Sequence, residues 1–205
     1  MLVLYPNFIH KEPIGTIMTT TNTINDFSML CRLFGNLFYR APQDEVIAPI
    51  FTWLQQGNLT ALWALAADPQ SEKALQQLQS AVAVEQLAAD YQALFADNGA
   101  VSTQISAYSD NLSDFVAFRQ LRAMPELPQA DHVAHLLLTA SWLEDHADSL
   151  AAQQELFERF LLPVMGKFLG KVEAHDQGFY RAAAQLCRDA LSAMADELEE
   201  DGEEE

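Results

Sequence analysis

The chain has 205 residues, half of them hydrophobic, so it can bury a sizeable core as one domain or as two small lobes. Its formal net charge of −18 and isoelectric point of about 4.4 argue against nucleic acid and anionic lipid as partners, because both require a dense basic face. A basic peptide or a basic protein surface is the better electrostatic match.

The first segment, "MLVLYPNFIHKEPIGTIM", is apolar at its start but joins no helical pattern. It lacks the basic n-region and the small-x-small cleavage site of a secretory signal. No stretch of the chain approaches the roughly 20 apolar residues of a membrane span. We expect residues 1–23 to form a flexible N-terminal extension, with residues 1–17 upstream of the native start at Met18.

Apolar side chains then recur at helical spacing along most of the chain, while two-residue alternation is weak, which predicts an all-α fold without strands. The first helix has Asn25 or Asp26 as its N-cap, the fourth pattern is broken near Ala83, and Pro163 kinks or divides the seventh. The helical patterns, in chain order, cover residues 27–38, 41–57, 58–67, 71–97, 114–122, 131–147, 149–175 and 178–200.

Two interruptions suggest a boundary inside one helical domain that spans residues 24–195. Residues 97–111 are rich in Gly, Ser, Thr and Asn, and residues 123–131 contain two prolines. We therefore expect lobes of about residues 24–110 and 111–195. The last ten residues, 196–205, carry eight of the 29 acids and predict a solvated, frayed acidic tail.

The segment 131–147 concentrates polar side chains on a pattern that otherwise indicates a buried helix. Asp131 stands where an N-cap is expected, and apolar residues on two opposite faces predict burial on two sides. His132, His135 and His146 share a side of this helix, but 14 residues separate the first from the last, about 21 Å along the axis. One ion cannot bridge that distance. His132 is expected at the edge of the core or at the floor of a cleft between the lobes, and the other two on its flanks.

Catalytic chemistry finds little support. The chain has no Gly-x-Ser-x-Gly elbow, P-loop or Gly-x-Gly-x-x-Gly motif. Cys31 and Cys187 lie in apolar helical sequence without a nearby histidine, which indicates packing in a reducing compartment. The His132/His135 pair lacks matching ligands at Glu-x-x-His spacing on another helix. We expect no catalytic residue, no metal site and no cofactor.

Three blocks resemble the TorD/DmsD family of cytoplasmic chaperones for redox and other metalloenzymes. The first is "DYQALF", similar to the family's Tyr-x-x-Leu-Phe element. The second is "PQADHVAHLLLTASWLED", similar to its Pro-x-x-Asp-His motif and the apolar helix that follows. The third is "FLLPVMGKFLGKVEAH" with "FYRAAAQL". The resemblance runs from about Asp26 to the acidic tail and is closest to the YcdY-like branch.

The resemblance implies one all-helical domain whose two lobes are joined by a hinge. It also implies a protein that performs no bond chemistry and holds an immature metalloenzyme, often by a twin-arginine signal peptide, until cofactor insertion is complete. Some members form domain-swapped dimers, so a monomer or such a dimer is expected. The residues that match the family's client-binding and motif positions are Tyr91, Phe95, Ser106, Tyr108, Pro128, Asp131 and His132.

One loop departs from the family pattern. Where the family has a Pro-Pro pair, this chain has Ser102 and Thr103, followed by Gln104. Losing the stiffness of proline predicts a more mobile loop and an altered peptide specificity.

Several functions therefore stay open. The leading expectation is a chaperone for a molybdoenzyme-type client or its signal peptide. The alternatives are a chaperone or activator of a soluble cytosolic metalloenzyme, a helical metal-dependent hydrolase built on His132 and His135, and a structural module that binds through its acidic tail.

Overall fold

The computed structural model describes residues 22–65, 68–146 and 149–203, with the side chains described from Asp26 to Gly202. The proposed start at Met18 and most of the predicted extension lie outside these residues. Two residues of that extension do not, because the first helix already begins at Asn22. The expected N-cap at Asn25 or Asp26 is therefore wrong, since both lie inside the first turns of the helix.

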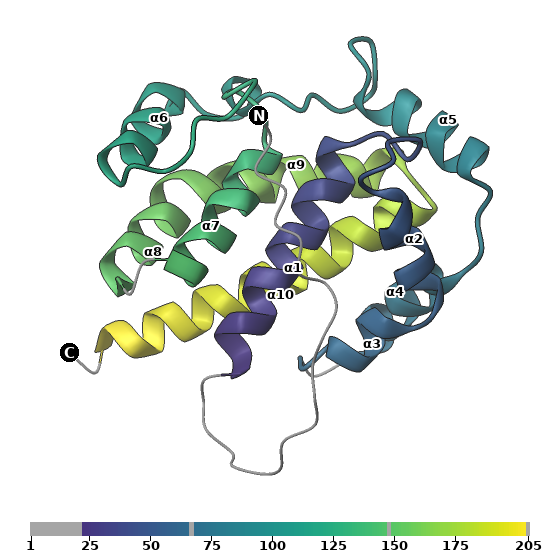
Figure 1. Ribbon diagram of the computed structural model, residues 1–205, viewed down its shortest axis with the longest axis horizontal. Coiled ribbons are helices and arrows are strands. Elements are labelled where there is room, and N and C mark those ends of the chain that lie inside the picture. Colours follow the sequence, from purple (N-terminus) through teal and green to yellow (C-terminus); the bar gives the residue numbers. More distant parts are fainter. Residues whose placement is uncertain (1–21, 66–67, 147–148, 204–205) are drawn as a thin grey trace.

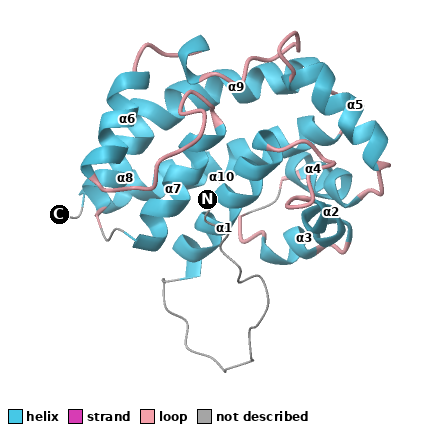
Figure 2. Cartoon of the chain, turned by 45° about the horizontal axis from the view of Figure 1, so that its top comes forward, coloured by secondary structure: helices cyan, strands magenta, loops and turns pink. Residues whose placement is uncertain are grey.

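The described part of the chain is helical and contains no strand, which confirms the all-α prediction (Figure 2). The elements are α1 (Asn22–Tyr39), α2 (Ala48–Gln55), α3 (Asn58–Leu62), α4 (Pro69–Gln79), α5 (Val84–Phe95), the 3₁₀ turn η1 (Ile105–Ala107), α6 (Leu112–Leu121), α7 (Ala134–His146), α8 (Leu150–Leu156), the π-helical turn η2 (Phe157–Leu161), α9 (Leu162–His175) and α10 (Phe179–Glu203). None of these helices is long and apolar enough to cross a membrane.

Local chemistry explains several helix ends. α4 begins with Pro69, and the Asp68 carboxylate accepts the backbone N–H groups of Gln70 and Ser71, which are two of the unpaired donors of a first turn. α4 ends at Gln79 and α5 begins at Val84, so the break predicted near Ala83 is confirmed.

Pro163 does not break its helix, because a π turn accommodates it. α8, η2 and α9 follow one another without a gap, and the π turn lies directly before the proline. In this wider turn the Leu162 N–H donates to the Phe157 carbonyl, five residues back. A π turn shifts the hydrogen-bond register by one residue, so it accommodates the missing N–H of proline at the start of α9.

α10 is the central element of the molecule and runs along its whole length (Figure 1). α9, α4 and α1 all pack against it, and α1 packs most extensively on α7. Buried residues from both predicted lobes belong to one continuous hydrophobic core. The lobe boundary near residue 110 therefore stays a prediction, because the core crosses it.

The C-terminal end differs from the expected frayed tail. α10 continues to Glu203, and its apolar stripe of Leu191, Met194 and Leu198 stays buried into the acidic stretch. The prediction of a frayed tail is wrong for residues 196–203, because the helix has a packed face as far as Leu198.

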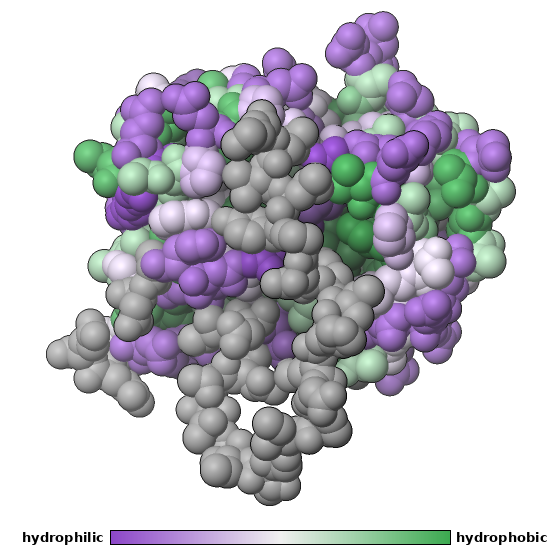
Figure 3. Space-filling model, in the orientation of Figure 1, coloured by the Kyte–Doolittle hydropathy of each residue, from purple (hydrophilic) through white to green (hydrophobic). Residues whose placement is uncertain are grey.

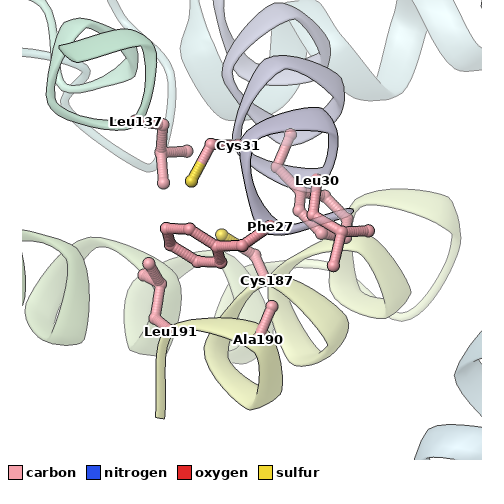
Figure 4. A pocket seen from close by; sticks show the side chains of 8 residues that line it. Phe27, Leu30, Cys31, Leu137, Cys187, Ala190 and Leu191 are labelled. Carbon is pink, nitrogen blue, oxygen red and sulfur yellow. The ribbon is translucent and has the colours of Figure 1, made fainter. Parts of the chain in front are cut away.

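The two cysteines have the expected packing role. Cys31 on α1 and Cys187 on α10 are free and buried, and burial raises the pKa of both thiols. Together with Leu137 of α7 they line a narrow apolar gap that has no room for a water molecule (Figure 4). Thiols held protonated in such surroundings behave as small hydrophobic groups.

Candidate functional site

The predicted site centres on the chain just before α7, where two loops cross. The backbone around His132 pairs with that around Gln104 in an isolated antiparallel bridge. Val133 N–H donates to the Thr103 carbonyl at 2.8 Å, and Ile105 N–H donates to the Asp131 carbonyl at 3.1 Å. The two loops that the sequence analysis identified as interruptions are therefore joined to each other.

Asp131 strengthens this crossing. Its carboxylate accepts two hydrogen bonds from Ser106, one from the backbone N–H at 2.8 Å and one from the hydroxyl at 2.6 Å. The prediction that Asp131 caps α7 is wrong: the helix begins three residues later, at Ala134, and the carboxylate is used by the other loop. We call this pair of residues the Asp131–Ser106 latch.

His132, rather than Asp131, provides a side-chain hydrogen-bond acceptor at the start of α7. The N–H of Ala134 donates to its Nδ1 at 3.2 Å, so the neutral ring carries its proton on Nε2. Its ring meets that of Tyr39 edge-on, with 4.9 Å between centroids. Burial, and then the neighbouring His135, lower the pKa of His132 to about 4, against a smaller opposing effect of Asp131. His132 is therefore a neutral, half-buried group at neutral pH.

His135 is a core residue, and the prediction that it lies on the helix flank is wrong. Only 1% of its surface is exposed, and its Nε2–H donates to the Pro128 carbonyl at 3.0 Å. Its Nδ1 is buried without a partner. His146 is exposed and stacks on Trp142, with 4.7 Å between ring centroids, as expected of a flank residue.

Arg119 holds the loop that contains Pro125 and Pro128, and it was not predicted from the sequence as a site residue. It is buried on α6, hydrogen-bonds the Thr139 hydroxyl of α7, and donates to the Pro125 carbonyl at 2.7 Å. Burial lowers the pKa of its guanidinium to about 10. A signal was available, because Arg119 directly follows Phe118 on an apolar stripe where a charged side chain is unusual.

Residues 123–130 thus form an exposed strap that is tied down from inside. Arg119 donates a hydrogen bond to the Pro125 carbonyl, and His135 donates one to the Pro128 carbonyl. Both prolines are themselves exposed. Apart from the buried Met124 and the half-buried Leu127, the strap presents its side chains to solvent, while two of its carbonyls bond to buried side chains.

Tyr108 links the crossing to α9. Its hydroxyl donates to the Ser102 carbonyl at 2.7 Å, and its own carbonyl accepts Lys167 Nζ at 2.9 Å. Lys171 Nζ lies 5.0 Å from the centre of its ring, a cation–π contact. The ring is buried, and burial raises the pKa of Tyr108 to about 12.

Tyr91 and Phe95 lie deeper, in the aromatic core. Phe95 is buried, and its ring contacts those of Phe38, Phe168 and Tyr180. Tyr91 is half-buried, and its hydroxyl donates to the Phe38 carbonyl at 3.3 Å. These two residues stabilise the wall behind the site, since Phe168 also contacts Tyr108.

The structure thus brings four predicted site residues to one surface, namely Ser106, Pro128, Asp131 and His132. Tyr108 supports them directly, while Tyr91 and Phe95 do so through the core. None of the seven lines the gap near the cysteines. An apolar cleft between the lobes at His132 stays a prediction.

The imidazoles have little capacity for a metal. His132 Nδ1 and His135 Nε2 are used by backbone groups. Among the described residues no group of three or more histidines, cysteines or carboxylates could hold an ion.

Comparison with known proteins identifies the family. The chain is 57% identical over 179 residues to an uncharacterised protein of Haemophilus influenzae, covering 87% of this chain and 97% of that one. It is 47% identical over 189 residues to the chaperone protein YcdY of Escherichia coli, covering 88% of this chain and all of the other. The chain belongs to the TorD/DmsD family, in its YcdY-like branch.

More distant members of the TorD/DmsD family agree. The Tat proofreading chaperone DmsD of Salmonella paratyphi A is 28% identical over 196 residues, covering 88% of this chain and 95% of its own. No family model matches the chain. Because the named relatives are chaperones, this family member is a chaperone of the redox-enzyme maturation type and not an enzyme.

Proposed function

We propose that this chaperone acts in the cytoplasm, where it binds an immature metalloenzyme until the cofactor has been inserted. The proposed client is of the molybdoenzyme type, and the bound segment is its twin-arginine signal peptide. Relatives that are named Tat proofreading chaperones support a client that carries such a signal. The proposal includes a monomer or a domain-swapped dimer as the working form.

The crossing of the two loops is the observation that carries this proposal. Ser106 and Pro128 are exposed, and hydrogen bonds to Asp131 and His135 respectively hold them on an anchored backbone rather than on a free loop. A rigid surface costs less conformational entropy when it binds a peptide. The polar side chains of this surface and the prolines of the strap suit an extended client segment that combines apolar and polar groups.

Electrostatics supports a basic client segment. The net charge is −18, and several arginines are already paired with carboxylates, such as Arg40 with Asp44 and Arg188 with Glu173. The face in Figure 3 is largely hydrophilic, with hydrophobic residues gathered toward α2 and α5. Such a surface attracts a basic n-region and offers apolar area to the segment that follows it.

The loop at Ser102 and Thr103 favours a second candidate, a soluble client without export. Proline would fix this loop by its ring, whereas here the Ser102 and Thr103 carbonyls accept hydrogen bonds from Tyr108 and Val133. The Ser102 and Thr103 side chains lack the apolar ring surface that two prolines would offer. This change suits a client segment with a different apolar pattern. The greater mobility expected of this loop stays a prediction.

Affinity capture from a native lysate tests both candidates. The wild-type protein is expected to retain an apo-metalloenzyme, and the first residues of that enzyme decide between an exported client with a twin-arginine leader and a soluble one. Capture of no metalloenzyme precursor contradicts the proposal.

Titration calorimetry with a synthetic peptide of the captured client's N-terminus then tests the surface. Asp131→Ala and His132→Ala are each expected to weaken binding about tenfold while helicity stays unchanged. The matched controls are Asp110→Ala and His175→Ala, which alter exposed residues of the same types. Equal binding by all four variants removes Asp131 and His132 from the site.

A further inference from the structure

The acidic end of α10 packs against α8 at a seam (Figure 1), and α7 borders this seam, since the charge of Glu197 on α10 acts on Glu144 of α7. Leu198 is 3% exposed, and Gln154 Nε2 of α8 donates to its carbonyl at 2.9 Å. At Gly202 the helix passes so close to the Gln154 amide that a Cβ there would overlap it. The helix is therefore packed as far as Leu198 and held by Gln154, although the residues that follow Leu198 are exposed and mostly acids.

Glu144 of α7 lies at this seam with an unusual hydrogen-bond pattern. Its Oε1 accepts Gln153 Nε2 of α8 at 2.6 Å, whereas its Oε2 is buried and has no hydrogen-bond partner among the described residues. Glu197 of α10 is the acid whose charge acts on it. A carboxylate with a bare buried oxygen beside a second carboxylate is costly, whereas a protonated carboxyl is not.

Among the described residues, the groups that shift the acid–base equilibrium of Glu144 are an acid and a neutral amide. α10 presents Glu197, and α8 presents the neutral Gln153. From α1 come the buried Cys31 thiol and, next to it, Arg32, whose guanidinium is engaged by Asp145 of α7.

These neighbours account for the acid–base properties of the seam. Burial, and then the charge of Glu197, raise the pKa of Glu144 to about 7. Burial, and then the exposed Asp201 and Glu200, also raise the pKa of Glu197. The docked end of α10 thus holds a proton that the same carboxyl groups would release if they were solvated.

We infer that Glu144 is a proton-operated latch for the end of α10. When Glu144 is protonated, residues 196–203 stay docked on α7 and α8. When it ionises, its repulsion by Glu197 releases them and uncovers the apolar contact of Leu198. The device lies apart from the predicted client surface and does not depend on the proposed function.

The direction of the effect follows from proton linkage. The docked carboxyl binds its proton more tightly than a solvated one, so docking is favoured at low pH and weakened as pH rises from about 4.5 through 7. A difference of this size bounds the effect at about 300-fold in the docking equilibrium. Solvent at the rim of the seam screens the charge, so we expect about tenfold.

Hydrogen-exchange mass spectrometry of the full-length protein tests the latch between pH 5.5 and 8.5, with exchange times corrected for the intrinsic rate. In the wild type, peptides that cover residues 195–203 are expected to lose about tenfold in protection as pH rises. In Glu144→Gln, which is always neutral, protection is expected to stay high at every pH.

The matched control is Glu199→Gln, which removes the same charge from an exposed position of the same helix end. It is expected to keep the wild-type pH dependence. The inference is overturned if Glu144→Gln loses protection as the wild type does. It is equally overturned if Glu199→Gln or 0.5 M salt abolishes the dependence, because surface repulsion would then explain it.

Discussion

Replacing Asp131 tests whether it latches two loops or caps a helix. Its carboxylate accepts two charge-assisted hydrogen bonds from Ser106, at 2.8 and 2.6 Å. Both residues are partly open to water, so each bond is expected to contribute about 0.5–1 kcal/mol, less than a buried one. Asp131→Ala should therefore lower the free energy of unfolding by about 1–2 kcal/mol, and Ser106→Ala by about 0.5–1 kcal/mol.

The double-mutant cycle separates the two interpretations. If the side chains interact, the second substitution costs less in the presence of the first, with a coupling of about 0.5–1 kcal/mol. Urea unfolding followed by circular dichroism at 222 nm measures all four proteins, and an unchanged m-value shows that the denatured state is the same. An N-cap at Asp131 would instead leave Ser106→Ala nearly neutral and the two effects additive. That result would refute the Asp131–Ser106 latch.

Three further predictions use matched pairs or a pH series. Tyr180→Phe removes a buried hydroxyl without a partner and should leave stability unchanged or raise it, whereas Tyr108→Phe loses a 2.7 Å bond and should cost about 1 kcal/mol in thermal unfolding. Gly99→Ala would push a Cβ into a backbone carbonyl and should cost about 2 kcal/mol, whereas Gly166→Ala meets nothing within 4 Å in mid-helix and should gain about 0.5–1 kcal/mol, both by urea unfolding. The pKa of His132 is lowered to about 4, so its contribution is complete above pH 6.5 and is lost as pH falls toward 4. His132→Phe should gain about 1 kcal/mol relative to the wild type between pH 7 and pH 5, and a constant difference would contradict this.

The helices were predictable because their apolar stripes are local and repeat along the chain. The predicted pattern of residues 178–200 already overlapped the acidic stretch, since Leu191, Met194 and Leu198 continue its stripe at helical spacing. The dense charge of residues 196–205 instead predicted a frayed tail. One buried apolar side chain per turn, as far as Leu198, outweighed it, because exposed charges at a helix end are well solvated.

The site was harder to predict because its contacts are long-range. An aspartate three residues before an apolar stripe has the pattern of an N-cap, and only the pairing with residues 103–106 diverts Asp131 to another loop. Helical periodicity placed His135 on a flank, yet Tyr39 and the proline strap cover it. A residue's angle on its own helix does not show what the rest of the chain lays over it.

Depth in the structure now orders the predicted client-binding residues. Phe95 and Tyr108 are buried, so their replacement should lower stability and client affinity together. Asp131 holds the surface in place and should affect both to a moderate degree. Pro128 is exposed, and His132 is half-buried with its Nδ1 used by the backbone, so their variants should lose affinity with the least loss of stability. The ratio of lost affinity to lost stability should therefore rise from the core outward, and a high ratio at Phe95 would mean that the client reaches the aromatic core itself.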